Sequence, residues 1–338
     1  MSPRYPDSTW AAAAPQEADF DEASFAAAHS WQIEQSAGRA YRTIVVRGGR
    51  VVAAWEQGIL PTAHVQLASA AKSVFSCMLA IALDEGKIEA ADAPVVDVYP
   101  AMMDVPAGCG PKSGRYAFPK DRAITFRQLI SNTSGYMKPG EEPGKVFHYQ
   151  TYGMNILTHA IAQVYGCYDS ADPTGSPGLA PLVSEKLRDP IGADWGYYTG
   201  NFDLHPAARI NIFGNYDGIS ATTAGMARLG WLWRHMGRWA DRQLVPADWL
   251  AEATRVNLDI RANGSPDQQR YGYGFWTNET GVLWPDLPTD SFAAIGAGSQ
   301  IIWVCPSLDL VIVESPGLWT KHEEVNQGLI ARIVAASR

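Results

Sequence analysis

Apolar residues that favour β-strands gather near both ends of this chain. Two such runs lie within residues 41–58, and Gly48 and Gly49 separate them. Strand-like runs divided by a glycine turn predict a β-hairpin. Further strand-like runs follow towards the other end of the chain, at 271–279, 297–304 and 308–315. We therefore expect a sheet that is built from both ends of the sequence.

Outside these runs, the spacing of apolar positions is mostly helical. A nearly uninterrupted apolar run follows Ser69, and residues 19–37 carry a helical pattern that begins after Asp21, a suitable N-cap. The other expected helices are 124–132, 155–166, 218–237, 245–255 and 323–337. Long loops rich in glycine and proline connect the helices of the central region.

This order of elements predicts an α+β fold. The simplest topology pairs the N-terminal hairpin with the C-terminal strands in one antiparallel sheet, and the two terminal helices pack on a face of that sheet. Residues 1–68 and 208–338 then form the sheet lobe, and residues 69–207 form an inserted, mostly helical lobe. Ser69 lies where the chain passes from one lobe to the other. A cleft between two lobes is the usual place for a small-molecule site.

Composition narrows the class of protein. The 338 residues are 46% hydrophobic and 18% charged, which suits a well-packed globular chain of one large domain or two intimate ones. A net charge of −8 without any basic run argues against a nucleic-acid partner. No apolar stretch is long enough to span a bilayer, so we expect no membrane association.

Cysteine and histidine usage predicts neither disulfides nor a metal centre. The four cysteines, Cys77, Cys109, Cys167 and Cys305, form no CxxC pair and read as free thiols. The seven histidines include no HExxH motif, so we expect neither a metal nor another cofactor. Residues 1–20 lack the apolar core of a secretory signal, and we therefore expect a cytoplasmic protein.

A Ser-x-x-Lys motif opens the apolar helix. Residues three apart share one helix face, so the Lys72 amine can reach the Ser69 hydroxyl. A desolvated lysine gives up its proton readily and could then accept the one on the serine. The motif taken alone also fits a helix-start serine beside a lysine whose aliphatic stem is buried and whose amine reaches solvent.

Five ordered blocks resemble the superfamily of serine β-lactamases and penicillin-binding proteins. The chain looks most like the branch of class C-like esterases, amidases and 6-aminohexanoate-dimer hydrolases. The first block resembles the nucleophile helix, the second the "LLTHTSG" segment, the third the Tyr-x-Asn block, the fourth a helix with the pattern "stardmARfg", and the fifth the strand pair of the Lys/His-Thr-Gly motif. The blocks are residues 67–95, 124–136, 147–166, 218–230 and 293–313.

The resemblance implies a β-lactamase/transpeptidase-like fold and assigns the chemistry. Ser69 falls on the nucleophile, Lys72 on its neighbouring base and Tyr149 on the tyrosine of the Tyr-x-Asn block. A tyrosine hydroxyl in this network can pass a proton to the leaving group. The oxyanion hole is expected from the backbone amides of Ser69 and Ala297.

Two positions depart from the family pattern. Thr151 stands where the Tyr-x-Asn block has its asparagine, and Ala294-Ile295-Gly296 replaces Lys/His-Thr-Gly. The second change removes the groups that engage a substrate carboxylate in true β-lactamases and transpeptidases. Thr151 and Gly296 are still expected to contact substrate, with Gly296 allowing the substrate to lie close to the strand.

Aromatic residues near these motifs have two readings. Tyr136 follows the Thr-Ser-Gly segment, and Tyr271, Tyr273 and Trp276 fall in one glycine-rich stretch. They either wall a substrate pocket, with Tyr136 as a binding residue, or pack in the core as large aromatic side chains usually do.

The favoured function is a serine hydrolase that cleaves a small ester or amide through an acyl-serine intermediate, with acyl transfer within reach of the same machinery. One alternative is a β-lactamase or D,D-peptidase, against which the lost Lys/His-Thr pair argues. Another is an inactive binding protein on the same fold, against which the presence of Ser69, Lys72 and Tyr149 argues. The sequence names neither the substrate nor the oligomeric state.

Overall fold

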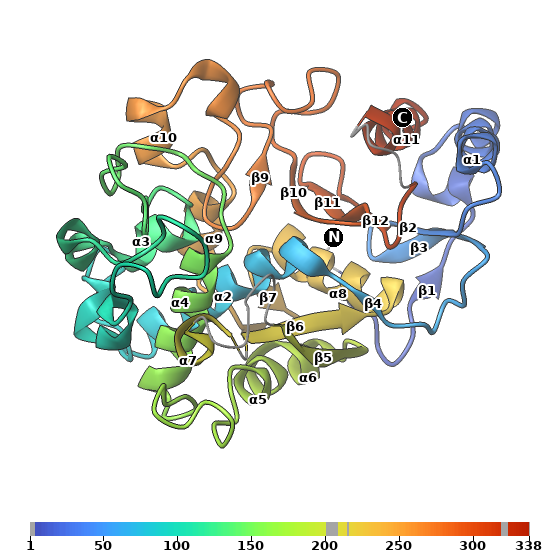
Figure 1. Ribbon diagram of the computed structural model, residues 1–338. Helices are drawn as coiled ribbons and strands as arrows, with labels where there is room; N and C mark the ends of the chain where they lie inside the picture. Colours follow the sequence, from blue (N-terminus) through green and yellow to red (C-terminus); the bar gives the residue numbers. More distant parts are fainter. Residues whose placement is uncertain (1–3, 201–208, 215, 319–323, 338) are drawn as a thin grey trace.

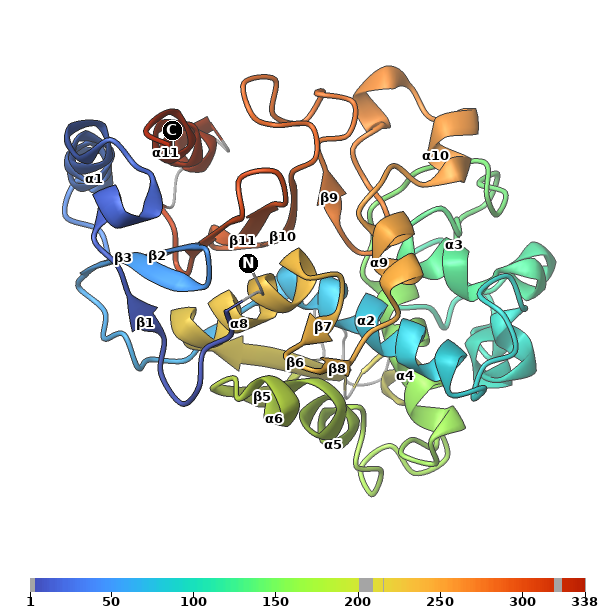
Figure 2. The same ribbon diagram turned by 180° about the vertical axis from the view of Figure 1, so that it is seen from behind.

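A mainly antiparallel sheet built from both ends of the chain forms the centre of the protein (Figures 1 and 2). The computed structural model describes residues 4–200, 209–214, 216–318 and 324–337. In sheet order, the strands are β1 (Ala11–Ala12), β3 (Arg50–Gln57), β2 (Tyr41–Arg47), β12 (Leu310–Glu314), β11 (Gln300–Cys305), β10 (Phe292–Gly296) and β9 (Trp276–Thr277). The predicted union of the N-terminal hairpin with the C-terminal strands is confirmed.

The hairpin turns where the sequence places its glycines. Gly48 and Gly49 have φ angles of +59° and +72°, in the left-handed region that glycine adopts without steric cost. Strand β2 then pairs antiparallel with β12, with Val45 opposite Ile312. The short β1 runs parallel to β3 at the sheet edge, so the sheet is not antiparallel throughout.

Helices cover both faces of this sheet. The terminal helices α1 (Glu22–Ser36) and α11 (Glu324–Ala335) lie side by side on one face, as predicted (Figure 1). The cap of α1 is also confirmed, because Ser24 N donates to Asp21 Oδ1 at 3.0 Å. Phe25 and Ile330 are buried against Trp303 on this face. The other face is covered by α8 (Thr223–Arg234), which begins at its cap Thr222.

Helix α8 comes very close to the sheet at one glycine. A Cβ atom on Gly230 would lie 2.6 Å from Val311 Cγ1 and 2.8 Å from Ile302 Cγ2. Both neighbours are β-branched side chains of buried central strands, so neither can move aside easily. A glycine at this position lets the helix backbone pack directly on the strands.

The helical part of the chain surrounds one buried helix. Helix α2 (Ala71–Asp84) runs through the middle of the protein and packs against α3 (Phe126–Ile130), α4 (Tyr152–Val164) and α9 (Ala247–Ala253). The shorter helices are α5 (Ala180–Val183), α6 (Asp189–Ile191), α7 (Ile210–Phe213) and α10 (Leu258–Asn263). Among the residues described, no helix combines the length and the apolar character needed to cross a membrane.

A second sheet joins the region predicted to be mostly helical, from which β5 comes, to the segments just before and just after it. It consists of β4 (Val65–Gln66), β6 (Tyr216–Ala221) and β5 (Trp195–Gly200), and β7 (Arg238–Trp239) pairs separately with β8 (Arg242–Gln243). Leu67 N extends the pairing of β4 by donating to Ile219 O at 2.8 Å. The backbone just before Ser69 is thereby anchored to a sheet.

The predicted strand at 271–279 is wrong over most of its length. Only Trp276–Thr277 forms a strand, and Gly272 N donates back to Phe275 O at 2.9 Å in a tight turn. Gly274 has φ +81°, which an ordinary strand residue does not adopt. The two glycines therefore turn the chain where its aromatic residues favoured a strand.

The predicted lobe boundaries stay a prediction, but one segment contacts the other lobe. Residues 247–263 follow the predicted boundary, yet Glu252 pairs with Arg127 at 3.1 Å. Asp259 likewise accepts a hydrogen bond from Thr133 at 3.1 Å. This segment of the predicted sheet lobe therefore packs on the helical part of the chain.

We expect Gly230→Val to destabilise the fold by about 1–3 kcal/mol, the cost typical of overpacking a well-filled core. The added side chain would force α8 away from Val311 and Ile302. Urea denaturation measures the change in the free energy of unfolding. The control Ala251→Val places the same side chain at an exposed position of α9 and should change stability little. Equal effects of the two substitutions would contradict the packing argument.

Candidate active site

Ser69 and Lys72 meet at the start of α2. Ser69 lies in a single turn of 3₁₀ helix, Ala68–Ala70, that leads directly into α2. Lys72 Nζ donates to Ser69 Oγ at 2.8 Å. The structure therefore brings together the two side chains that the Ser-x-x-Lys spacing predicted to share a helix face.

Lys72 is buried although it carries an ionisable amine. Its exposed fraction is only 3%, whereas Ser69 is partly exposed. Burial disfavours the charged ammonium and lowers the pKa of Lys72 from 10.5 to about 7. Near neutral pH, a substantial fraction of Lys72 is therefore the free amine, which has a lone pair and can accept a proton.

Tyr149 is the third member of the cluster and lies beside the buried Lys72 amine. The Lys72 Nζ atom lies 4.8 Å from the centroid of the Tyr149 ring. Burial raises the pKa of Tyr149 to about 12, and a hydrogen bond to Ser69 opposes this rise. The phenol thus stays protonated near neutral pH and is available as a proton donor. Tyr149 comes from the loop before α4, separated from Ser69 by 80 residues of chain.

A tight turn from the far end of the sequence supports the first turn of α2. Ser73 Oγ donates to Gly274 O at 2.6 Å, and a Cβ atom on Gly274 would lie 2.7 Å from Lys72 O. Glycine is required there both for this approach and for its positive φ. Sequence analysis missed this contact, because the same residues resemble a strand.

Strand β10 packs directly on the turn that carries Ser69. A Cβ atom on Gly296 would lie 2.0 Å from Leu67 O and 2.9 Å from Ala70 N. The glycine therefore allows the strand to approach the protein's own backbone, a role that differs from the predicted approach of substrate to the strand. The exposed Ala297 follows at the end of β10, next to the Ser69 turn. Its place in an oxyanion hole with Ser69 stays a prediction.

Two of the predicted substrate-binding side chains, Tyr136 and Thr151, have different surroundings in the structure. Tyr136 is 0% exposed, and its hydroxyl donates to Met102 O in the core. The structure therefore corrects the prediction that Tyr136 lines a pocket. Thr151 is half-buried at the N-cap position of α4, two residues from Tyr149, and its hydroxyl does not cap that helix. Its contact with substrate stays a prediction.

The other aromatic candidates divide between core and site. Tyr149 packs edge-on against Tyr271, with 5.6 Å between ring centroids, and at a tilt of 32° against Trp276, with 5.5 Å between ring centroids. Tyr271 is buried, whereas Trp276 is partly exposed and forms the accessible edge of this aromatic group. Tyr273 instead accepts a hydrogen bond from Arg127 at 2.7 Å, away from Tyr149. Both Tyr271 and Tyr273 are therefore buried residues of the core, and of the two Tyr271 also contacts Tyr149.

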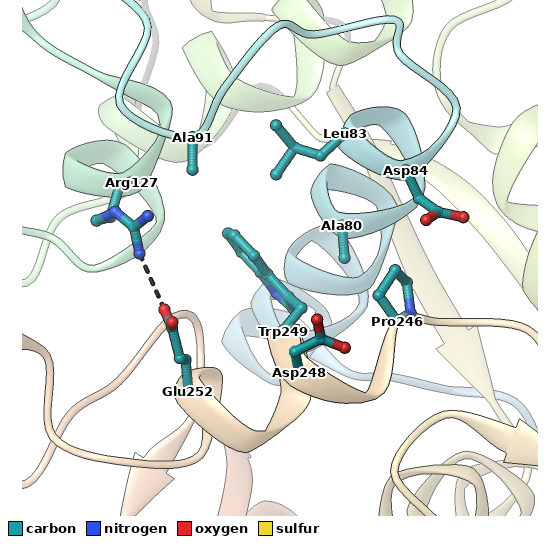
Figure 3. A pocket seen from close by; sticks show the side chains of 9 residues that line it. All are labelled: Ala80, Leu83, Asp84, Ala91, Arg127, Pro246, Asp248, Trp249 and Glu252. Carbon is teal, nitrogen blue, oxygen red and sulfur yellow. Dashed lines mark hydrogen bonds and ion pairs between the residues drawn. The ribbon is translucent and has the colours of Figure 1, made fainter.

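A separate pocket of about 330 Å³ lies at the opposite end of α2 (Figure 3). Its lining residues are Ala80, Leu83, Asp84, Ala91, Arg127, Pro246, Asp248, Trp249 and Glu252. Arg127 and Glu252 form an ion pair across it. Because Ala80 follows Lys72 by eight residues, about 12 Å along the helix axis, this pocket is distinct from the Ser69 cluster.

Solved structures with the same fold are only distantly similar in sequence. A provisionally named 6-aminohexanoate-dimer hydrolase from Bacillus anthracis is 17% identical, with a TM-score of 0.64 over 90% of this chain and 80% of its own. A hydrolase with promiscuous acyltransferase activity is 13% identical, with a TM-score of 0.66 over 92% and 98%. A family VIII carboxylesterase is 16% identical, with a TM-score of 0.66 over 93% and 97%. At these identities, the similarity shows the fold alone.

Family membership comes from the sequence itself. Among curated proteins, none matches this chain. The Beta-lactamase family model matches residues 32–314, which include the Ser69 turn, the Tyr149 loop and strands β10 to β12. Because this match spans most of the chain and the fold agrees with it, the chain belongs to the Beta-lactamase family.

Proposed function

We propose that this protein is a serine hydrolase that cleaves a small ester or amide through a covalent acyl-serine. The observation that carries the proposal is the 2.8 Å hydrogen bond between Lys72 and Ser69, made by an amine that is almost fully buried. Serine is a weak nucleophile at neutral pH and needs a base within hydrogen-bond reach. A lysine whose pKa is lowered to about 7 can be that base.

In the acylation step, the neutral Lys72 amine takes the proton of the Ser69 hydroxyl while Oγ bonds to the substrate carbonyl carbon. The carbonyl oxygen becomes an oxyanion, for which we propose the backbone N–H groups of Ser69 and Ala297 as donors. As the bond to the leaving group breaks, the proton passes from Lys72 to the leaving atom by way of the Tyr149 hydroxyl.

In the deacylation step, water attacks the acyl-serine and releases the acid and free Ser69. An alcohol or amine in place of water would give acyl transfer by the same route. The distantly similar hydrolase with promiscuous acyltransferase activity supports this extension. We further expect the enzyme to act without a metal or other cofactor and in the cytoplasm.

The substrate acyl group is proposed to be uncharged near the reacting carbonyl. Ala294 and Ile295 occupy the positions of the Lys/His-Thr pair, and neither carries charge or a hydrogen-bonding side chain. The partly exposed Trp276 adds an aromatic surface beside Tyr149. These features favour a neutral ester or amide with apolar character.

Hydrolysis of a β-lactam is the second candidate function, because family membership favours it. The uncharged pair at Ala294-Ile295 disfavours recognition of the β-lactam carboxylate. Comparison of nitrocefin with a nitrophenyl ester separates the two candidates. Nitrocefin hydrolysis as fast as that of the better ester would place the β-lactamase function first.

We expect Ser69→Ala to abolish turnover and to leave the protein folded, because one partly exposed hydroxyl contributes little packing. Mass spectrometry after brief incubation with an activated ester should find an acyl adduct on Ser69 of the unmodified protein. The control Ser76→Ala removes another serine hydroxyl of α2, one that accepts a hydrogen bond from Trp249. This variant should still form the adduct on Ser69. An adduct on another residue contradicts the assignment, and its absence from folded protein supports a binding function.

The base role of Lys72 predicts a distinct pH dependence. Only the neutral amine accepts a proton, so kcat/KM should rise with pH and reach half its plateau at about 7, the lowered pKa of Lys72. Lys72→Arg should be inactive across this range, since arginine stays protonated. The control Lys186→Arg changes a lysine that forms an ion pair with Glu85 at 2.7 Å, and it should leave the pH dependence of kcat/KM unchanged. Activity in Lys72→Arg would show that the residue acts as a fixed charge.

The proton-donor role of Tyr149 predicts a loss that depends on the leaving group. Tyr149→Phe should lower kcat about one hundred- to ten thousand-fold for an amide, the range for one general acid–base group. The loss should be smaller for a nitrophenyl ester of the same acid, because nitrophenolate leaves without a proton. Tyr165→Phe, which removes a phenol bonded to Glu85, is the matched control. Equal losses for both substrates would rule out proton donation to the leaving group.

A further inference from the structure

Tyr149 lies in an irregular segment, and one residue holds that segment on both sides. His148 N donates to the backbone carbonyl of Asn132 at 2.9 Å. Gln150 N donates to the side-chain oxygen Oδ1 of the same asparagine, also at 2.9 Å. The two hydrogen bonds therefore flank Tyr149 along the chain. Neither strand nor helix pairing supports the backbone at this position, which makes the two bonds its main restraint.

Asn132 is itself rigidly placed. It follows α3 with a φ of +59°, in the left-handed region where asparagine is one of the few tolerated residues besides glycine. Its exposed fraction is 1%, and its N–H donates to Leu129 O at 3.2 Å. The neighbouring Thr133 hydroxyl bonds to Ser131 and Asp259. The backbone and side-chain oxygens that accept hydrogen bonds from the Tyr149 segment thus both belong to Asn132, which its own neighbours hold in place.

The aromatic contacts of Tyr149 restrain the ring rather than its position along the chain. Tyr271 packs edge-on and Trp276 packs at an interplanar angle of 32°. Ring contacts of this kind tolerate sliding, whereas a hydrogen bond weakens steeply when its geometry changes. The distance between the Tyr149 hydroxyl and Ser69 therefore depends on the backbone restraint.

We propose that Asn132 is a positioning residue for the proton donor Tyr149. This inference rests on the proposed function, since it gives Asn132 a role only if Tyr149 acts in the reaction. Asn132 touches neither Ser69 nor Lys72 in the contacts described, so its effect on turnover passes through Tyr149. Misplacement of a reacting group by a fraction of an ångström to an ångström is enough to lower a rate by one or two orders of magnitude.

The test is a double-mutant cycle with Asn132→Gly and Tyr149→Phe. Glycine keeps the positive φ and the backbone carbonyl, so this change removes the side-chain acceptor of Gln150 N together with the side-chain amide group that interacts with the Tyr271 hydroxyl. We expect Asn132→Gly to lower kcat for an amide about ten- to one hundred-fold with little change in KM. In the Tyr149→Phe background, the same change should cost about two-fold or less, because no proton donor remains to be positioned.

Two further measurements separate positioning from general destabilisation. Hydrogen exchange of the Gln150 amide should become faster in Asn132→Gly. The control Gln32→Ala removes another buried amide, on α1, which donates to the Thr43 hydroxyl at 2.7 Å, and should leave kcat unchanged. Asn132→Asp keeps an acceptor oxygen and should retain kcat within a few-fold. If Asn132→Gly does not fold, the activity of Asn132→Asp is the measurement that tests the proposal.

The outcomes distinguish this inference from the proposed function. Equal losses from Asn132→Gly in both backgrounds overturn the positioning role, as does full activity in the folded glycine variant. A loss in Asn132→Asp as large as that in Tyr149→Phe also overturns it. If Tyr149→Phe itself retains full activity, the proton-donor role fails and the positioning role fails with it. If Tyr149→Phe is impaired and Asn132→Gly is not, only the positioning role fails.

Discussion

The removal of the Lys72 amine from water is the constraint around which this protein is arranged. The pKa of Lys72 falls from 10.5 to about 7. Relative to water, the protein therefore favours the neutral amine over the charged ammonium by roughly 5 kcal/mol. That preference exists only while the surroundings stay dry, because water at the amine would restore the charged form. Helix α2 must therefore be enclosed on every side at its first turn. The hydrogen bond to Ser69 then couples the buried amine to a group that substrate can reach.

The enclosure is assembled from distant parts of the sequence. Strand β10 approaches the Ser69 turn through Gly296, and the tight turn at Gly274 rests on the backbone of Lys72. At both glycines, a Cβ atom would collide with backbone, which cannot rotate away as a side chain can. The C-terminal strands thus form part of the wall of the active site as well as the centre of the main sheet. Stability of the sheet and reactivity of the lysine are physically linked in this way.

The departures from the family pattern leave the cluster of Ser69, Lys72 and Tyr149 in place. Ser69, Lys72 and Tyr149 keep the geometry that acyl transfer needs. In the proposed function, the uncharged Ala294-Ile295 pair would alter substrate recognition more than bond cleavage. The aromatic residues beside Tyr149 provide an apolar surface instead. On this proposal, specificity and chemistry would be determined by different residues of the site.

Sequence alone determined the features that depend on local geometry. The three-residue spacing of Ser69 and Lys72 places them on one face of any helix that includes them. The glycine pair after Arg47 can form a hairpin turn without help from the rest of the fold. The order of strand-like and helical runs predicted the sheet topology, and the family blocks then supplied Tyr149. Only the tertiary structure decided that Tyr136 is a core residue, that Gly274 belongs to a turn, and that Gly296 abuts the Ser69 turn. These outcomes depend on which segments, far apart in the sequence, meet in space, and local propensity carries no information about such contacts.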